Sequence, residues 1–455
     1  MKFLFINKPF FIEPLGIMYL ASAIKKEGHK VELAITSQNL ENKIKEFNPD
    51  FIGYSIMTGD QNFYDKLNEK LKQNFDFFSI AGGPHPTFFP EMLEGSSFDA
   101  ICRGEGEAAL TQFLKDPLSN QISNFYFKKS KGNKQIVKNS VQSLISNLDD
   151  IKFPDRDLVF QYPEINKGPI KHFIASRGCP YSCSYCFNES FSELYNRKGK
   201  RVRFRSIDNL LKEVKQVIDD SPTKVVYFQD DTFILKPEWL KEFAEKYPKK
   251  IGLPFHCHTR ANLVTPEIVK DLKKARCYSV HIAAESGNEN VRRNVLNREM
   301  SNEQIIGAVK LFKEDKIKTM LQNILGLPFT TLKNDFETLE LNIKCQPDYA
   351  WASIFQPYPR TKLGQRCLEQ GVYTGDFSDI NSSFFDQSVL NIDNKNEITN
   401  LQKLFAISVK YPKLYTSGKL NKLIQMPYEK TRERYTKMYK TFRKKADRIL
   451  FGVDL

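Results

Sequence analysis

The stretch "SRGCPYSCSYCFNES", Ser176–Ser190, decides the fold, because it gathers three thiols within eight positions. Cys179, Cys183 and Cys186 are spaced by four and three residues, and an aromatic residue stands directly before the third. The other cysteines of this 455-residue chain are scattered, which is not typical of a disulfide framework. We therefore expect a reducing cytoplasm, in which clustered thiols more often bind metal. The scattered cysteines are Cys102, Cys257, Cys277, Cys345 and Cys367.

The number and spacing of these thiols favour an iron–sulfur cluster over a structural zinc site. Structural zinc usually has four ligands arranged as two spaced pairs, and no second pair lies near this loop. Three thiolates bound to a four-iron cluster leave one iron open, and metal centres that bind a substrate directly keep such a position. We favour a [4Fe–4S] cluster with one open iron. Zinc completed by a histidine and three inert thiols remain the alternatives.

The segment that carries the cysteines begins a series of alternating strands and helices. A candidate strand at 171–177 leads directly into the cysteine loop, and helical stretches separate most of the later strands. Six such units predict a partial parallel barrel with its chemistry at the C-terminal ends of the strands. The five later candidate strands are 224–233, 253–260, 278–287, 318–328 and 349–359.

An earlier series of strands and helices occupies the first part of the chain. Strands alternating with helices predict a doubly wound parallel sheet, on which ligands bind beyond the carboxyl ends of the strands. Two glycine loops follow strands there, "GGPHPT" at 82–87 and "RGEGE" at 103–107. Glycine lets a backbone approach a flat ligand closely, so both loops are candidate binding elements.

The domain organisation follows from these two series. We expect a Rossmann-like domain at 1–130, a linker at 131–167, the partial barrel at 168–375 and a basic helical region at 376–455. The apolar start predicts a buried strand and not a signal peptide. No run of about 18 apolar residues predicts a membrane span.

The positive charge of the chain is concentrated at its end. The formal net charge is +14, and residues 401–455 contain ten Lys and four Arg against four acidic residues. Such a tail could contact nucleic acid, an anionic membrane or an acidic substrate. We interpret it as the solvated face of basic helices.

The cysteine motif, in a loop after the first strand of a six-unit barrel, resembles that of the radical S-adenosylmethionine (radical SAM) superfamily. The resemblance implies that SAM itself is the missing ligand of the cluster, through its amino and carboxylate groups. Alternatively, Asp230 and Asp231 cap a helix and Glu285 forms an ion pair at the barrel mouth with Arg298. The resemblance places these residues at SAM: Tyr185, Gln229, Asp230, Glu285 and Arg298.

Four upstream stretches together resemble the cobalamin-binding domain that precedes many radical SAM cores: "PLGIMYLASAIKKEGHKVEL", "GYSIMTGDQ", "GGPHPTFFPE" and "CRGEGEAAL". The chain lacks the D-x-H-x-x-G motif. The resemblance therefore implies a corrin without histidine on its cobalt, and His85 borders the corrin or orients its loop. The residues expected at the corrin are Gly82, Gly83, His85, Thr87, Gly104, Glu105, Gly106 and Glu107.

The resemblance implies an enzyme with a [4Fe–4S] cluster, SAM and cobalamin as cofactors. The expected activity is C-methylation, in which a 5′-deoxyadenosyl radical activates an unactivated carbon and methylcobalamin donates the methyl group. The alternative is a non-methylating cobalamin-dependent radical reaction such as ring contraction, cyclisation or another rearrangement. A hypothesis of another class is an RNA-binding protein with a structural cluster, although such a cluster needs no open iron.

The expected partners are a small-molecule or natural-product substrate and a one-electron reductant of the flavodoxin or ferredoxin type. We do not expect a nucleic acid partner, and the sequence singles out no catalytic side chain. Alternation along a strand sends Cys257 to the face opposite His256 and His258, which favours core packing for Cys257. Trp351 and Phe355 line either a substrate cavity or an aromatic core.

Overall fold

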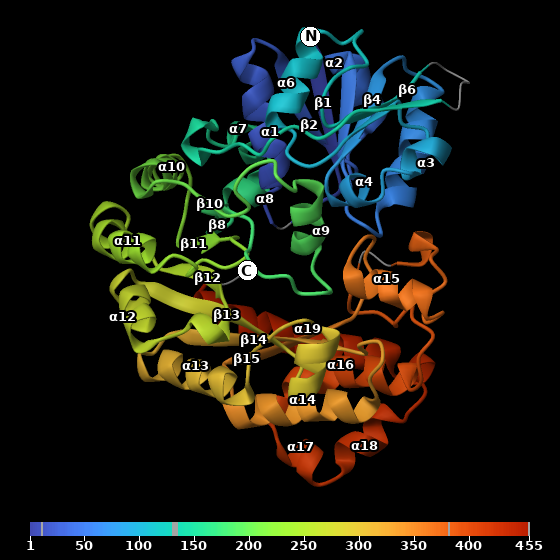
Figure 1. Ribbon diagram of the computed structural model, residues 1–455. Coiled ribbons are helices and arrows are strands. Elements are labelled where there is room, and N and C mark those ends of the chain that lie inside the picture. The colour runs from blue at the N-terminus through green and yellow to red at the C-terminus, as the bar shows by residue number, and fades with distance from the viewer. Residues whose placement is uncertain (11, 130–134, 381–382, 454–455) are drawn as a thin grey trace.

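The computed structural model describes residues 1–10, 12–129, 135–380 and 383–453, and it consists of two α/β units and a helical C-terminal region (Figure 1). The first unit lies above the second in that view, and the C-terminal helices flank the second. Within these ranges, no helix has both the length and the apolar composition that crossing a membrane requires.

The first unit is a sheet with the strand order β2-β1-β3-β4-β5-β6-β7, in which β1 to β5 are parallel. Alternation along β1 sends Phe3 and Phe5 to one face and Leu4 and Ile6 to the other. Helices α1 and α6 cover the first face, and α2 and α3 cover the second, as predicted for a doubly wound sheet. The elements are β1 (Lys2–Asn7), α1 (Leu15–Lys26), β2 (Lys30–Ile35), α2 (Leu40–Phe47), β3 (Phe51–Ser55), α3 (Gln61–Lys72), β4 (Phe78–Gly82), α4 (Pro84–Phe88), α5 (Met92–Gly95), β5 (Ala100–Cys102) and α6 (Glu107–Lys115).

Two antiparallel strands, β6 (Phe125–Lys128) and β7 (Ile136–Lys138), extend this sheet. The sequence analysis missed them, and β7 lies inside the range expected to be a linker. These strands are short, and the charged residues between them obscure the alternation that buries Phe125 and Phe127. Residues 131–134 of that linker range lie outside the described residues.

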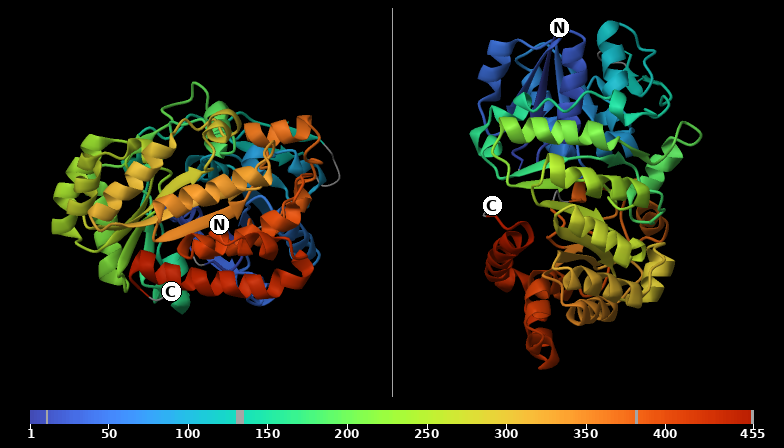
Figure 2. Two further views of the ribbon diagram at one scale, coloured as in Figure 1. Left: turned by 90° about the horizontal axis from the view of Figure 1, so that it is seen from below. Right: turned by 90° about the vertical axis from the view of Figure 1, so that its left-hand side faces the viewer.

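The second unit contains six parallel strands in the order β15-β14-β13-β12-β11-β8, which confirms the predicted partial barrel. Helices α10 to α13 pack their apolar faces on the outside of this curved sheet (Figure 2). The elements are α7 (Asp157–Phe160), α8 (Pro163–Asn166), β8 (Ile170–Phe173), β9 (Ser176–Arg177), α9 (Phe187–Leu194), β10 (Arg203–Phe204), α10 (Ile207–Asp220), β11 (Val225–Phe228), α11 (Pro237–Lys250), β12 (Phe255–Thr259), α12 (Pro266–Lys274), β13 (Cys277–Glu285), α13 (Asn302–Glu314), β14 (Lys318–Leu325), α14 (Leu332–Cys345) and β15 (Tyr349–Ile354).

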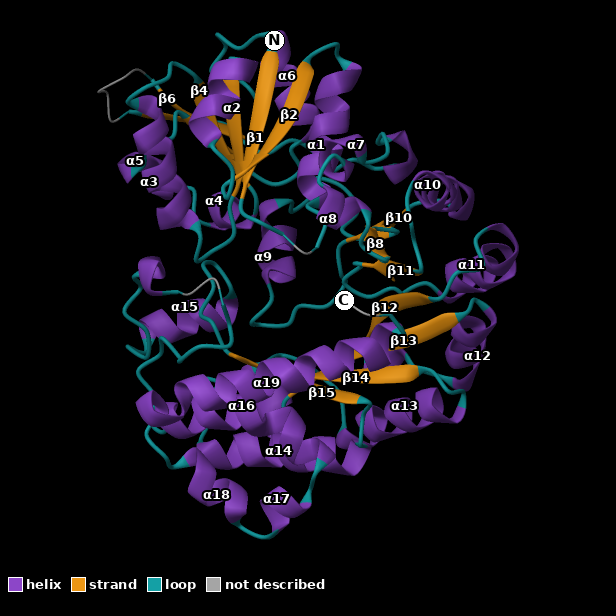
Figure 3. Cartoon of the chain, turned by 180° about the vertical axis from the view of Figure 1, so that it is seen from behind, coloured by secondary structure: helices purple, strands orange, loops and turns teal. Residues whose placement is uncertain are grey.

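The basic tail forms part of the fold. Figure 3 shows α16 and α19 lying across β14 and β15. The end of α19 packs Leu450 and Phe451 against Tyr227 and Met320 inside the barrel, while basic side chains such as Lys437 on the same helix are exposed. The C-terminal helices are α15 (Lys362–Glu369), α16 (Lys395–Lys410), α17 (Lys413–Thr416), α18 (Lys419–Ile424) and α19 (Tyr428–Phe451).

An ion-pair network joins the two α/β units. The carboxylate of Glu105, in the loop before α6, accepts hydrogen bonds from Arg177 on β9 at 3.1 Å and from Arg203 on β10 at 2.8 and 3.0 Å. Arg177 also donates to Glu107 at 2.6 Å. Glu105 and Arg203 are almost fully buried, and the arginines hold the pKa of Glu105 below its usual range in spite of burial. The network fixes β9 and β10, which frame the cysteine loop.

A second ionic contact fixes the same junction. Arg156, which lies before α7, donates to Glu13 of the first unit at 3.1 Å and to Glu213 of the barrel at 2.8 Å. The backbone N–H of His172 on β8 also donates to Glu13, at 2.7 Å. Because these charges are buried and paired, the two units are held in one relative orientation.

We expect Glu105→Ala to lower the free energy of unfolding by about 3–5 kcal/mol, because it leaves the buried Arg203 guanidinium without its carboxylate and takes one of two carboxylates from Arg177. Glu105→Gln, which keeps one acceptor, should cost less. Urea unfolding measures the effect. Glu91→Ala is the matched control, since its ion pair with Arg360 also joins the units but is exposed, and it should change stability by at most about 1 kcal/mol. Equal losses for Glu105→Ala and Glu91→Ala would contradict this account of the junction.

A buried carboxyl near the end of β14 generates a pH prediction. Asp335 on α14 accepts the backbone N–H of Gly326, and burial raises the pKa of its carboxyl to about 7. The folded pKa exceeds the unfolded value, so the wild type loses stability as the pH rises from about 4 to about 7.

Asp335→Asn keeps the acceptor for Gly326 and removes the titration. We expect the variant to gain stability relative to wild type as the pH rises from 5 to 8, by up to a few kcal/mol. Thermal unfolding at both pH values measures this. Asp208→Asn is the control, because its lysine partners lower the pKa of that exposed carboxyl to about 2, below the tested range. A pH-independent effect of Asp335→Asn would refute the prediction.

Candidate active site

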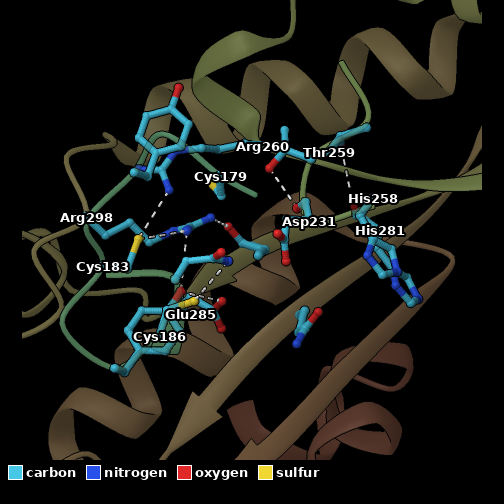
Figure 4. A pocket seen from close by; sticks show the side chains of 16 residues that line it. Cys179, Cys183, Cys186, Asp231, His258, Thr259, Arg260, His281, Glu285 and Arg298 are labelled. Atoms are coloured by element: carbon cyan, nitrogen blue, oxygen red, sulfur yellow. Dashed lines mark hydrogen bonds between the residues drawn. The ribbon is translucent and has the colours of Figure 1, made fainter. Parts of the chain in front are cut away.

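The cysteine loop leaves β9 through a glycine that no other residue can replace without displacing backbone. Gly178 has a φ of +85°, and a Cβ atom there would lie 2.2 Å from the carbonyl oxygen of Arg201. The loop then places Cys179, Cys183 and Cys186 on one cavity at the C-terminal ends of the barrel strands, as Figure 4 shows. They are the only cysteines among the described residues that line this cavity.

Polar groups surround two of these thiols. Arg260 and Arg298 each point a guanidinium N–H at Cys183 Sγ, at 3.5 and 3.7 Å. The side-chain amide of Asn188 lies 3.6 Å from Cys186 Sγ. Burial raises the pKa of the Cys186 thiol to about 12. The thiolate is the form of cysteine that binds metal, so a bound metal ion or cluster is needed to stabilise Cys186 in that form.

A second group in the same cavity consists of three residues that the sequence analysis placed at SAM. The Tyr185 hydroxyl donates to Glu285 Oε1 at 2.8 Å and lies 3.4 Å from an N–H of Arg298. Glu285 ends β13 with a φ of +70°, a costly conformation for a residue with a side chain, and strain of this kind is concentrated at functional sites. Glu285 Oε2 and Arg298 Nε are buried and have no hydrogen-bond partner among the described residues.

The turn after β11 differs from the expectation. Asp230 and Gln229 do not line the cavity, whereas their neighbour Asp231 does. The Asp230 carboxylate accepts the Ser176 hydroxyl at 2.5 Å and the backbone N–H of Ala175 at 3.1 Å. It therefore anchors the strand that leads to the cysteines. Neighbouring residues of an extended turn point in opposite directions, and the sequence alone did not show which of the two aspartates faces inward.

Sequence reasoning missed several residues of the cavity wall. On β12, Cys257 packs in the outer core as predicted, which directs His256 and His258 to the concave face. The alternation of "FHCHTR" carried this signal, but the sequence did not show which face was the interior. The wall residues missed are Tyr181, Asn188, Asp231, Thr232, His258, Thr259, Arg260, His281, Ala283 and Gln322.

The two glycine loops of the first unit are tied to each other. Thr87 Oγ1 donates to the carbonyl of Gly83 at 2.8 Å and accepts the backbone N–H of Gly104 at 3.0 Å. Gly83 has a φ of +93°, and a Cβ atom there would lie 2.9 Å from Ile56 N. His85 lines a second cavity, where burial lowers the pKa of its imidazole to about 4. A neutral ring therefore faces this cavity.

The "RGEGE" loop has a different environment from the one expected. Glu105 and Glu107 bind the arginines of the domain junction, and Gly104 lies under Tyr195, where a Cβ atom would come within 1.9 Å of the hydroxyl oxygen. Gly106 packs beside Leu20. The carboxylates of this loop thus connect the units, while contact of its residues with a corrin remains a prediction.

The loops of the first unit reach the cysteine loop directly. Phe88 of α4 packs against Phe187, the residue after Cys186, with ring centroids 5.7 Å apart. Arg360, after β15, donates to the Phe88 carbonyl and to Glu91. The carboxyl edge of the first sheet and the mouth of the barrel therefore face each other at the cysteines.

A third cavity adjoins the cysteine cavity and shares Tyr185 and Gln322 with it. Gln356 lies on its wall, and both polar atoms of its buried amide lack hydrogen-bond partners among the described residues. The predicted Trp351 and Phe355 line this cavity, and Phe355 also belongs to a core cluster. The other aromatic residues of the wall are Tyr358 and Phe384.

The residues present fit the cofactors that the motifs imply. Three thiols on one cavity, beside guanidinium groups, suit an iron–sulfur cluster with an open position. The unpartnered Glu285 and Arg298 atoms suit a polar ligand that carries both hydrogen-bond donors and acceptors, such as SAM.

Comparison with known proteins agrees with this geometry. A family model described as the radical SAM superfamily matches residues 173–341, and one described as a B12 binding domain matches residues 1–114. An uncharacterised methyltransferase of Pyrococcus horikoshii is 28% identical over 370 residues, which cover 78% of each chain. An anaerobic magnesium-protoporphyrin IX monomethyl ester cyclase of Cereibacter sphaeroides is 26% identical over 81% of this chain and 62% of the cyclase.

A solved structure shares the fold. The radical SAM methyltransferase TsrM of Kitasatospora setae, determined with cobalamin and a [4Fe–4S] cluster bound, superimposes with a TM-score of 0.66 at 15% identity, over 81% of this chain and 75% of TsrM. The cofactors of proteins built from these two domains are a [4Fe–4S] cluster, SAM and cobalamin. With both domains present in this order, the chain belongs to the family of cobalamin-dependent radical SAM enzymes.

Proposed function

We propose that the protein is a cobalamin-dependent radical SAM C-methyltransferase. One observation carries the proposal: the loops of the B12-binding domain pack, through Phe88 and Phe187, directly beside the third cluster cysteine. A molecule bound in the cavity beside Tyr185 would therefore lie near both cofactors. A misplacement of about 1 Å can cost about a hundredfold in rate, so the rigid ionic junction between the units supports this chemistry.

When bound, the cluster supplies the electron that cleaves the sulfonium bond of SAM, and cobalamin carries the methyl group. The residues of this chain hold and orient these groups. Cys179, Cys183 and Cys186 would hold the cluster, and Glu285 and Arg298 offer their free atoms to SAM. The apolar rings around the adjoining cavity exclude water from the reacting carbon.

The names of the relatives support two different reactions. The Pyrococcus relative bears the name of a methyltransferase and covers most of both chains, which favours methyl transfer. The Cereibacter relative is named as a cyclase, which favours a non-methylating reaction on the same scaffold as the second candidate.

We further propose a small-molecule substrate in the aromatic cavity, a reductant of the flavodoxin or ferredoxin type, and a location in the reducing cytoplasm. A planar or largely apolar substrate suits the rings of the cavity wall, and the unpartnered Gln356 amide suits an edge with one donor and one acceptor.

Anaerobic turnover of SAM with a deuterated methyl group, using reconstituted cluster and cobalamin, tests the proposal. We expect 5′-deoxyadenosine and S-adenosylhomocysteine to form together, with label recovered in the cobalamin fraction. Mass spectrometry measures all three. Formation of 5′-deoxyadenosine without S-adenosylhomocysteine or label would contradict methyl transfer and favour the cyclase-like alternative.

A pair of cysteine variants tests the assignment of the cluster ligands. Cys183→Ala should abolish the brown colour and the cleavage of SAM, because it removes one of the three thiols. It should leave corrin binding largely intact, since the corrin loops lie in the first unit. Cys257→Ala is the control, because Cys257 packs in the outer core of the barrel, and it should retain iron and activity. Normal SAM cleavage by Cys183→Ala would disprove the assignment.

A further inference from the structure

Three imidazoles meet inside the barrel, below the cysteine cavity. His256 and His258 come from β12 and His281 from β13, and one ring nitrogen of each lies within 4.8 Å of the others. The strand register pairs His258 with His281. We propose that these three histidines form a binding site for one divalent cation of the Zn²⁺ type, separate from the cluster.

The hydrogen bonds of His256 determine which of its nitrogens is free. The Ser279 hydroxyl has one proton and donates it to the Leu450 carbonyl at 2.5 Å. Ser279 must therefore accept from His256 Nδ1, which lies 2.5 Å away and carries the ring proton. The lone pair of His256 is then on Nε2, which is buried and has no partner among the described residues. An orphaned buried acceptor of this kind is unfavourable, and a bound cation would give it a partner.

The other two rings are also suited to ligation. The backbone carbonyl of Asp230 is a hydrogen-bond partner of His258, and the Tyr227 hydroxyl lies 2.9 Å from His258 Nε2 and 3.4 Å from His281 Nδ1. The Asp230 carbonyl accepts the ring N–H of His258, and the Tyr227 hydroxyl occupies the remaining lone pair, so Tyr227 has to turn away when a cation binds. Burial keeps all three rings neutral: it lowers the pKa of His258 to about 4 and those of His256 and His281 well below the usual value. Neutral imidazole is the form that binds metal.

The three ring nitrogens need to move only a short distance to bind one ion. Zinc–nitrogen bonds of about 2.0–2.1 Å place tetrahedral ligand atoms about 3.4 Å apart, so each nitrogen has to move by less than about 1 Å. The His258 and His281 rings are nearly parallel, at 17°, and one of them has to turn about its Cβ–Cγ bond. Arg443 of α19 opposes a cation at His281, although its ion pair with Asp447 at 3.6 Å offsets part of this charge.

The place of the site suggests what the ion would do. His258 and His281 line the cavity that also contains the cluster cysteines, whereas His256 lies deeper, against Phe451 of α19. Three protein ligands leave a coordination position open, as in catalytic zinc sites. That position would face the cavity and bind an oxygen or nitrogen atom of the molecule held there. The cation site itself does not depend on the outcome of the radical reaction.

The test uses the full-length chain with its cluster reconstituted, incubated with Zn²⁺ and desalted. We expect about one zinc per chain by elemental analysis. The zinc absorption edge should show nitrogen or oxygen at about 2.0–2.1 Å and no sulfur at about 2.3 Å. His256→Phe and His281→Phe should each weaken zinc binding at least tenfold, and Cys257→Ala, on the opposite face of β12, should bind as wild type does.

Three results would overturn the proposal. The first is a sulfur shell around the zinc, which would assign it to the cysteines. The second is the absence of retained zinc, and the third is equal retention by wild type and His281→Phe. The wild-type spectrum alone is decisive should a histidine variant fail to fold. Because the readout is metal binding, failure here leaves the proposed methyl transfer untouched.

Discussion

The structure depends on keeping three thiols in one cavity, beside two guanidinium groups. Burial raises the pKa values of Cys179 and Cys186, and the guanidinium groups of Arg260 and Arg298 lie at Cys183. A bound metal centre would stabilise the thiolate form of such buried cysteines. The six parallel strands deliver these residues to one end of the barrel, and Gly178 allows the loop to pass the backbone of Arg201.

The second constraint is the fixed relation between the two units. Glu105 belongs to a loop that resembles a corrin-binding element, yet its carboxylate holds the two arginines beside the cysteine loop. These ion pairs hold the first unit to the strand that leads into the cysteine loop. A radical enzyme benefits from this rigidity, because a reactive group must meet one carbon and no other.

Much of the fold was predictable from the sequence, because strong periodicity marks all six barrel strands and the first five strands of the other sheet. The antiparallel strands β6 and β7 were not, since both are short and the residues between them in the sequence are mostly charged or polar. The three clustered cysteines were predicted from their spacing, and the group of Tyr185, Glu285 and Arg298 from the resemblance to radical SAM proteins. The inward turn of Asp231 and the gathering of His256, His258 and His281 were not predicted, because they depend on which face of each strand forms the interior. Pairing of Glu105 with Arg203 joins residues distant in sequence, and no local pattern predicts it.

We propose that the polypeptide supplies three ligands to the cluster and leaves the fourth iron to SAM. Electron–nuclear double resonance of the reduced, reconstituted enzyme with SAM labelled with ¹⁵N at its amino group tests this directly. We expect a ¹⁵N coupling that appears only with labelled SAM and requires all three cysteines. A cluster nitrogen signal that arises instead from labelled histidine of the protein, unchanged by SAM, would contradict it.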